Sequence, residues 1–280
     1  MKPRISAVIL TLNEEKNIAN ALRSVASWVD EIILVDMYSE DRTVVIAKDF
    51  GAKVFDHPPI GFQDPARPFA MDKASGDWII NLDADEIVSF QLSRELIRIA
   101  QNDLADVCSV PRLNFIGGKP MLHTGWGPNG DRQLRFLKKG ALIFSPRVHV
   151  RPTPDATKRL LTLTYPENGA LIHFNYLNTS HFLDKLNRYT DIEATQARES
   201  GKHSSIRSLL TAPALEFLKR YLLLSGFRDG WNGLYYSFLM SIYRMTAIAK
   251  MRELEERLDV EGIRNRYQAI ADEELQRFKA

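Results

Sequence analysis

Short apolar runs that end in a polar or acidic residue recur through the first third of the chain. Between the first two runs, Ile18, Leu22 and Val25 follow the spacing of one helix face. Strands that alternate with helices predict an α/β fold of Rossmann type, with a mainly parallel sheet and helices on both faces. The runs expected to form strands are residues 5–11, 31–36, 53–56 and 77–83.

Polar residues between these runs predict where the helices begin and end. We expect Asn13 to cap the first helix and Ser39 or Asp41 to cap the second. The second helix should continue through Phe50 and stop at Gly51, because glycine readily adopts the left-handed conformation that ends helices.

Two regions with different patterns follow. Beyond about residue 110, frequent glycine and proline residues predict short strands and long loops, and from His181 onward the pattern becomes helical. The sequence therefore predicts a ligand-binding and catalytic domain over residues 1–178 and a helical C-terminal region over residues 179–280.

The stretch from Lys202 to Arg252 differs in chemistry from the rest of the chain. It holds eight basic and two acidic residues, a net charge of +6, together with eight aromatic residues. This mixture is typical of helices that lie in a membrane interface. The apolar run over residues 233–249 is too short to span a bilayer and contains Arg244. The alternative is an ordinary amphipathic lobe packed on the catalytic domain.

Composition limits the possible partners and the setting. A formal net charge of +2 over 280 residues argues against a nucleic-acid-binding protein. The single cysteine, Cys108, cannot form an internal disulfide, which fits a reducing cytoplasm. The N-terminal apolar stretch is interrupted by polar residues and has no cleavage site, so no signal peptide is expected.

Polar side chains gather at the carboxyl ends of the expected strands, where open parallel sheets bind ligands. These residues are Thr11, Asn13, Asp36 and Asp83. Each alone could simply cap a helix or a turn, but four on one rim favour a binding site.

Asp83-Ala84-Asp85 directly follows an apolar strand and is followed by Glu86. Two carboxylates separated by one residue can reach one hard cation, and oxygen ligands suit Mg²⁺ or Mn²⁺. Such an ion would neutralise the charge that develops on a departing diphosphate.

Three segments of the first 90 residues resemble the family 2 glycosyltransferases of GT-A fold, in both order and spacing. They are residues 7–15, 31–43 and 76–86. Within this family the chain is most similar to the bacterial lipopolysaccharide-core glucosyltransferase branch. That similarity lies in residues 133–136, 171–176 and 185–189.

The resemblance implies which residues bind the nucleotide sugar. Thr11, Asn13 and Glu14 would surround the base and ribose, and Asp36 would contact the base or ribose. Asp85 would be the main metal ligand. Asp83 would lie near the ribose or the donor sugar and could also ligate the metal.

Members of the family invert the anomeric centre, so a carboxylate must take the acceptor proton. Asp131 is the first choice for this base and Glu86 the substitute. Asp131 could instead be a turn residue beside Asn129-Gly130, a sequence typical of hairpins.

Three arginines are candidates for binding the diphosphate: Arg67, Arg132 and Arg135. Each could instead be a solvated surface charge. Pro68 departs from the Asn that the branch usually has after the residue matched by Arg67. His149 and His173 are candidates to complete the metal shell, with His173 preferred for its family match.

The function expected from the sequence is transfer of a sugar from a nucleotide sugar, with a UDP-sugar as the expected donor. The acceptor would be a lipid-linked or lipopolysaccharide-core saccharide, reached on the cytoplasmic face of an anionic membrane. Two alternatives are a phosphohydrolase of haloacid dehalogenase type and a non-catalytic binding protein. A nicotinamide-dependent enzyme is disfavoured because residues 11–15 contain no glycine.

Overall fold

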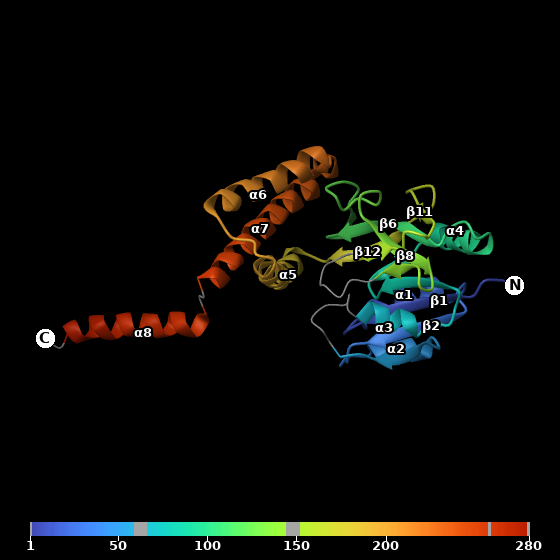
Figure 1. The fold of residues 1–280 in the computed structure, drawn as a ribbon, viewed down its shortest axis with the longest axis horizontal. Helices are drawn as coiled ribbons and strands as arrows, with labels where there is room; N and C mark the ends of the chain where they lie inside the picture. The colour runs from blue at the N-terminus through green and yellow to red at the C-terminus, as the bar shows by residue number, and fades with distance from the viewer. Residues whose placement is uncertain (1, 59–65, 144–151, 257–258, 279–280) are drawn as a thin grey trace. The chain divides into compact units, whose positions relative to one another are not determined.

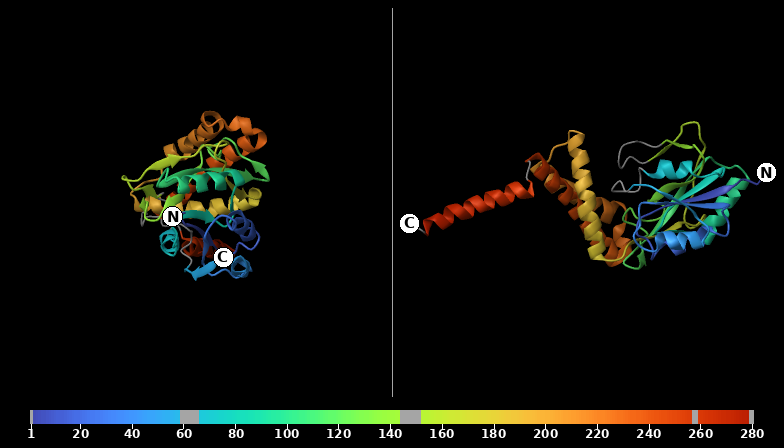
Figure 2. Two further views of the ribbon diagram at one scale, coloured as in Figure 1. Left: turned by 90° about the vertical axis from the view of Figure 1, so that its right-hand side faces the viewer. Right: turned by 90° about the horizontal axis from the view of Figure 1, so that it is seen from below.

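The computed structural model describes residues 2–58, 66–143, 152–256 and 259–278. The chain divides into two compact units, Met1–Leu177 and Asn178–Ala280. Figure 1 shows the elements of both units, and Figure 2 gives two further views.

The first unit is built on one sheet. Among the described residues, ten strands belong to it, and eight of them lie in the order β3-β2-β1-β4-β8-β6-β12-β5. Pairing is parallel from β3 to β4, whereas β8 runs antiparallel to both of its neighbours. The strands that form the main path are β1 Ile5–Thr11, β2 Glu31–Asp36, β3 Lys53–Asp56, β4 Trp78–Asp83, β5 Glu86–Val88, β6 Val107–Ile116, β8 Arg132–Lys138 and β12 Leu171–Tyr176.

Short strands complete this unit. β7 and β11 both pair with β6, while β9 and β10 form a separate two-stranded sheet. Their bounds are β7 Lys119–Pro120, β9 Leu142–Ile143, β10 Thr153–Pro154 and β11 Leu160–Thr162. The helices of the unit are α1 Ile18–Val25, α2 Thr43–Asp49, α3 Arg67–Asp72 and α4 Phe90–Gln101.

Two hydrophobic cores lie on opposite faces of the sheet because side chains alternate along each strand. Ile9 of β1 packs in a core with α1, α2 and α4, whereas its neighbour Leu10 packs in a core with α3. The α/β class, the mainly parallel sheet and the helices on both faces are therefore confirmed.

Glu31 joins three strands and a loop at the start of β2. Its Oε1 accepts hydrogen bonds from the hydroxyl of Ser6 at 2.6 Å and from the backbone N–H of Ser75 at 2.6 Å. Its Oε2 binds Lys53 Nζ at 2.9 Å. Burial alone would raise its pKa, but these donors lower the pKa of Glu31 to about 2.

We expect Glu31→Gln to reduce the free energy of unfolding by about 2–3 kcal/mol at pH 7. A carboxylate with a lowered folded-state pKa stabilises the protein above its unfolded pKa of about 4.3 and loses this effect as the pH falls towards the folded value. The difference between variant and wild type should therefore shrink between pH 5 and about 2 in urea titrations. A constant difference across that range, or an equal loss in the control Glu167→Gln, would contradict this assignment.

The structure confirms the first three strands with the bounds expected from the sequence, and the fourth begins one residue later than expected. Gly51 follows α2 with a φ of 76°, as expected for a helix stop. The capping expectation for Asn13 is wrong. Its φ is 56°, α1 begins only at Ile18, and the Asn13 side chain accepts a hydrogen bond from Glu40 N instead.

Two further expectations need correction. α2 begins at Thr43, and neither Ser39 nor Asp41 is its N-cap residue, although Asp41 binds the first N–H of the helix at 2.9 Å. The region after residue 110 is also more regular than expected, because β6 is ten residues long and pairs with four other strands.

The second unit is helical, as expected from the sequence. It contains α5 Thr179–Glu199, α6 Ile206–Leu218, α7 Gly230–Glu255 and α8 Val260–Arg277. Between α6 and α7 lie the π-helical turn η2 Lys219–Leu223 and the 3-10 turn η3 Gly226–Asp229. α6 and α7 lie side by side as a hairpin (Figures 1 and 2). Within the described residues, no helix has both the length and the apolar character needed to cross a membrane.

Candidate functional site

The adjacent strands β6, β12 and β5 bring several polar residues together. His173 on β12 lies directly opposite Asn114 on β6 and opposite Glu86 on β5. Asp83 is the last residue of β4, and the short turn after it carries Asp85. Backbone pairing therefore fixes the positions of these side chains relative to one another.

Asp83 is held by two arginines. Its Oδ1 accepts from Arg67 Nη2 at 2.7 Å, and its Oδ2 accepts from Arg135 Nη2. Burial would raise its pKa, but the two guanidinium groups hold the pKa of Asp83 far below the usual range. Both carboxylate oxygens of Asp83 are thus engaged with cations of the protein itself.

Arg67 reaches Asp83 from the first turn of α3. Pro68 follows it in that turn, where proline is well tolerated because the missing N–H would have no helical partner. The Arg67 guanidinium also donates to Asn81 on β4 at 3.2 Å. Pro68 departs from the pattern of the family branch, but it does not prevent Arg67 from binding Asp83.

Glu86 is fully buried in the same cluster. Its Oε2 accepts the backbone N–H of Asp83 at 3.0 Å, and its Oε1 accepts from Arg135 at 3.0 Å and from Arg112 at 3.3 Å. Burial opposes the charge of the Arg135 guanidinium, but Asp83 and Glu86 raise its pKa above the usual value. Glu86 is therefore an internal counterion between two arginines.

Asp131 is nearly buried and is oriented by three side chains. Its Oδ2 accepts from Arg112 Nε at 2.9 Å and from Asn114 Nδ2 at 2.8 Å, and its Oδ1 accepts from Gln133 at 2.8 Å. Burial would raise its pKa, but the charge of Arg112 and these hydrogen bonds lower the pKa of Asp131. The carboxylate is consequently ionised at neutral pH.

The turn expected at Asn129-Gly130 is present, but it is not a two-residue hairpin. Gly130 N and Asp131 N both bond to Gly127 O, at 2.9 and 2.8 Å, and Asp131 directly precedes β8. β8 then pairs with β4 and β6, both distant in sequence.

His173 faces Asp85, with its Nε2 3.4 Å from Asp85 Oδ2. On the other side of the ring, Nδ1 lies 2.6 Å from Asn114 Oδ1. The amide nitrogen of Asn114 is already committed to Asp131 and to the carbonyl of Trp126. Its oxygen must therefore accept from Nδ1–H, which leaves the Nε2 lone pair of a neutral His173 directed at Asp85.

A carboxylate oxygen and an imidazole lone pair that face each other at this distance fit a divalent cation. Adjacent ligands of an octahedral ion with bonds of about 2.1 Å lie roughly 3 Å apart. An imidazole fixed through its other nitrogen is the usual arrangement of a metal-binding histidine. Within the described part of the chain, no three His, Cys, Asp or Glu residues form a complete metal cluster. Further ligands would have to come from a substrate, as is common for Mg²⁺ at phosphate groups.

The loops after β1 and β2 form the other half of the rim. Asp36 accepts from the hydroxyl and the N–H of Ser39 at 2.6 and 2.8 Å, and Ser39 Oγ in turn accepts from Asn13 N at 2.8 Å. The hydroxyl of Thr11 is buried, and among the described residues it has no hydrogen-bond partner. Glu14 N donates to Thr43 Oγ1 at 2.8 Å. These bonds fix both loops before any ligand binds.

Arg132 lies apart from the Asp83 cluster in its contacts. Its guanidinium donates to the carbonyl of Leu163 at 3.1 Å and to the carbonyl and side chain of Asn129. Diphosphate binding by Arg132 stays a prediction. His149 lies outside the described residues.

Sequence reasoning missed two residues of this site, Arg112 and Asn114. Together they connect Glu86, Asp131 and His173 into one network. A signal existed, because both are polar residues two positions apart within β6, which is otherwise mostly apolar.

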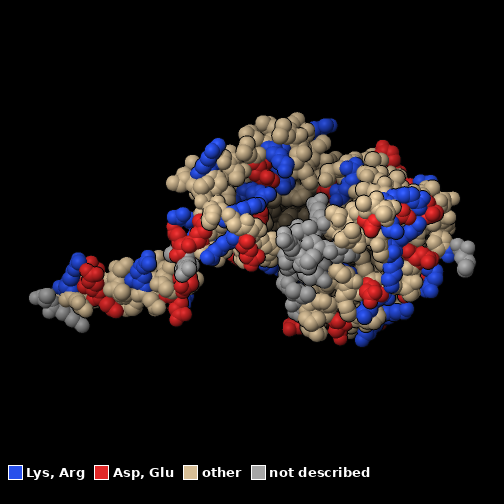
Figure 3. Space-filling model, in the orientation of Figure 1, with Lys and Arg blue, Asp and Glu red and all other residues tan. Residues whose placement is uncertain are grey.

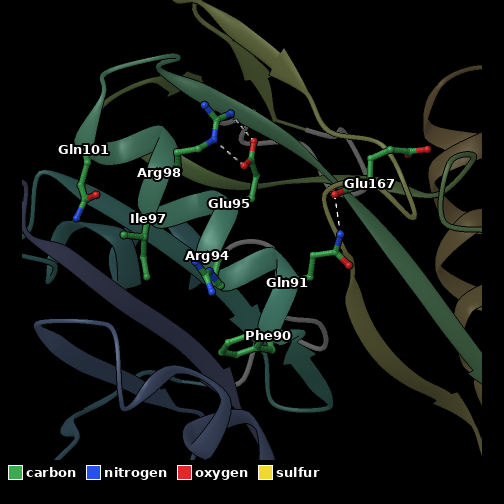
Figure 4. Close-up of a pocket in the computed structure, with 8 residues that line it drawn as sticks. All are labelled: Phe90, Gln91, Arg94, Glu95, Ile97, Arg98, Gln101 and Glu167. Carbon is green, nitrogen blue, oxygen red and sulfur yellow. Dashed lines mark hydrogen bonds and ion pairs between the residues drawn. The ribbon is translucent and has the colours of Figure 1, made fainter.

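A groove of about 570 Å³ lies along α4, away from all these residues. It is lined by α4 side chains and Glu167, and two of the lining pairs bond to each other: Glu95 with Arg98 at 2.7 Å and Gln91 with the Glu167 carbonyl at 2.7 Å (Figure 4). None of the candidate site residues lines this groove, so it is separate from the carboxylate and arginine site.

Comparison with known proteins decides the family. Residues 6–152, just over half of the chain, match the model of glycosyl transferase family 2. The chain belongs to glycosyl transferase family 2. The resemblance stated from the sequence is therefore confirmed, and a dehalogenase-type phosphohydrolase or a nicotinamide-dependent enzyme no longer needs to be considered.

Relatives in this family extend the similarity over nearly the whole chain. The chain is 29% identical to the lipopolysaccharide core biosynthesis glycosyltransferase LpsC of Rhizobium meliloti, over 91% of this chain and 97% of LpsC. It is also 29% identical to an uncharacterized glycosyltransferase of Rickettsia typhi, over 90% and 87% of the two chains. Among solved structures, S. aureus TarS in complex with UDP matches with a TM-score of 0.47 and 15% identity, over 90% of each chain.

Proposed function

We propose that this family 2 glycosyltransferase transfers a hexose, with inversion, from a UDP-sugar to a lipid-linked or lipopolysaccharide-core saccharide. The observation that carries the proposal is the Asp85–His173 pair, 3.4 Å apart and oriented by Asn114, beside a cluster of arginines and carboxylates. Support for the acceptor class comes from the similarity to LpsC over nearly the full length of both chains.

Asp85 and His173 would hold Mg²⁺ or Mn²⁺. When bound, the ion supplies positive charge to the departing diphosphate. Asp83 is a weaker candidate for ligation because its oxygens are bound by Arg67 and Arg135. We propose instead that Asp83 positions these arginines, whose guanidinium groups can bind phosphate oxygens in two-pronged fashion.

Asp131 is favoured over Glu86 as the general base. A carboxylate oxygen can accept about two hydrogen bonds. Among the described residues, Gln133 is the one side chain that donates to Asp131 Oδ1, so this oxygen keeps a lone pair for the acceptor hydroxyl. Glu86 is fully buried, and its Oε1 is shared by two arginines.

The nucleotide would occupy the rim formed by the loops after β1 and β2. Asp36 and the Ser39 hydroxyl lie at the end of β2, the usual place for recognition of a ribose or base in such sheets. Thr11 and Asn13, at the end of β1, and the adjoining Glu14 would complete this part of the site. In this arrangement residues 1–178 form the donor-binding and catalytic domain.

The C-terminal helical region would keep the enzyme on the cytoplasmic face of an anionic membrane as a peripheral protein. Its exposed apolar and basic side chains support this proposal. A peripheral position would bring the catalytic domain to a lipid-linked acceptor.

A thermal-shift panel of nucleotide sugars, with Mn²⁺, Mg²⁺ or EDTA, tests the donor. A ligand that binds only the folded state raises Tm by mass action, so a UDP-sugar with Mn²⁺ should raise Tm by several degrees, about 2–4 °C per kcal/mol of binding energy. UDP-sugars should exceed the matched GDP- and ADP-sugars. Equal shifts with all bases, or a shift unaffected by EDTA, would contradict the proposal.

A further inference from the structure

The end of the α6–α7 hairpin presents an unusual concentration of exposed apolar side chains. We call residues 218–231 the hairpin tip. Leu223 is 81% exposed and Trp231 is 76% exposed. The tip also exposes Leu218, Leu222, Leu224 and Phe227. Figure 3 shows largely uncharged surface with interspersed basic side chains over this end of the hairpin.

The tip has a defined shape. A Cβ at Gly233 would lie 1.8 Å from the carbonyl oxygen of Gly226, so the first turn of α7 packs directly against the tip backbone. Phe217 contacts Phe238 of α7, with ring centroids 4.4 Å apart, and also stacks on Tyr221 at 5.3 Å. The leucines and Trp231 are therefore held outward from a packed base.

Several basic side chains of the helical unit are paired with carboxylates of the same unit, and these pairs lie away from the tip. Towards the other end of α7, Arg244 binds Glu193 at 2.6 Å and Lys250 binds Asp191 at 2.7 Å. Arg252 is likewise paired, with Glu256 at 2.5 Å. These basic side chains are engaged inside the helical unit and contribute little net attraction to an external surface.

In the described part of the chain, two basic side chains of the tip are not paired in this way, as is also true of Lys202 and Arg207 near the start of α6. Lys219 and Arg228 are exposed, and within the described residues neither has a carboxylate partner. They flank Leu222, Leu223 and Leu224 in the sequence. Positive charge without an internal counterion thus coincides with the exposed leucines.

We infer that the hairpin tip inserts its leucines and Trp231 into the interface of one leaflet of an anionic membrane, while Lys219 and Arg228 bind lipid phosphates. Apolar side chains gain by entering the acyl boundary, basic ones gain from the negative surface, and tryptophan favours the interfacial depth. The inference deepens the proposed function, since it rests on an acceptor that is carried by a membrane, and it names the element that docks there.

The test is flotation with vesicles of phosphatidylcholine alone or with phosphatidylglycerol. Leu223→Glu should lower the partition coefficient on anionic vesicles at least about tenfold, because burial of one leucine is worth that much. The matched control is Ile206→Glu, which places the same charge on a residue 80% exposed at the other end of α6. An equal loss in both variants would show that the side of the hairpin binds, and would overturn the inference.

A second pair of variants separates charge from apolar contact. Lys219→Gln with Arg228→Gln should weaken binding to anionic vesicles by roughly tenfold or more and reduce its salt dependence. The control, Arg264→Gln with Arg266→Gln on α8, removes the same charge and should change binding less than twofold.

Fluorescence and enzyme assays make failure of the inference distinguishable from failure of the proposed function. Vesicles with brominated lipids should quench the wild type and leave Trp231→Phe much less quenched. Leu223→Glu should also retain wild-type release of UDP with a water-soluble saccharide acceptor. If the wild-type protein released UDP but bound no vesicles, the inference would be overturned and the proposed function would stand. If the tip variants abolished self-association in sedimentation and left vesicle binding unchanged, the tip would be a dimer contact. That result would also overturn the inference.

Discussion

Asp85→Asn should reduce turnover at least about 1000-fold, because loss of a cation at the leaving group removes several kcal/mol of transition-state stabilisation. The fold should survive. The Asp85 side chain is about one-fifth exposed, and in the described structure its carboxylate lies 3.4 Å from His173 Nε2. Release of nucleoside diphosphate under saturating donor and acceptor measures the effect, and thermal unfolding checks the fold.

Four comparisons make this test specific to the metal. His173→Gln should lower turnover to a similar extent, and the double variant should be little worse than either single one, because residues that act as a unit are not additive. Asp49→Asn, on the surface at the end of α2, should behave as wild type. Turnover that persists in excess EDTA would refute the metal site even if Asp85→Asn were inactive.

Asp131→Asn should lower kcat by roughly 100-fold or more while leaving the affinity for the donor nearly unchanged, as expected for loss of a general base. The asparagine keeps the shape of the side chain but cannot take the acceptor proton. Pre-steady-state measurement of the chemical step, together with donor titration, separates the two effects.

The pH profile gives an independent readout. Arg112, Asn114 and Gln133 lower the pKa of Asp131, so the base stays ionised down to pH values below the ordinary aspartate pKa of about 3.9. We therefore expect kcat/KM to show no acid limb from this residue above that pH. If Asp131→Asn retained the chemical step and Glu86→Gln lost it, the base would have to be reassigned to Glu86.

The sequence predicts the first half of the fold well because its strands are buried on both faces. β1 and β2 are continuous apolar runs bounded by polar residues, and their bounds follow directly. The conformation of Asn13 could not be predicted because its decisive contacts are with Ser39 and Glu40, on a loop that follows the next strand. Local propensity describes neighbours in sequence, and here a distant loop determines the conformation.

The candidate site shows the same limit. The Asp83-Ala84-Asp85 motif was identifiable because its residues are consecutive, whereas Arg112 and Asn114 join the site through strand pairing. The net charge of Lys202–Arg252 likewise follows from the sequence, but carboxylates of the same unit pair with Arg244, Lys250 and Arg252. Such pairings depend on helix packing and cannot be read from composition.

Glu86, Asn114 and His173 lie on three neighbouring strands, with β12 paired to both β5 and β6, and this placement affects how such enzymes diverge. Hydrogen-bonded strands hold side chains more accurately than loops do. The helical unit supplies none of these three residues and can therefore accept insertions and substitutions without displacing them. New acceptors can thus arise by change in the periphery while the reaction itself is inherited intact.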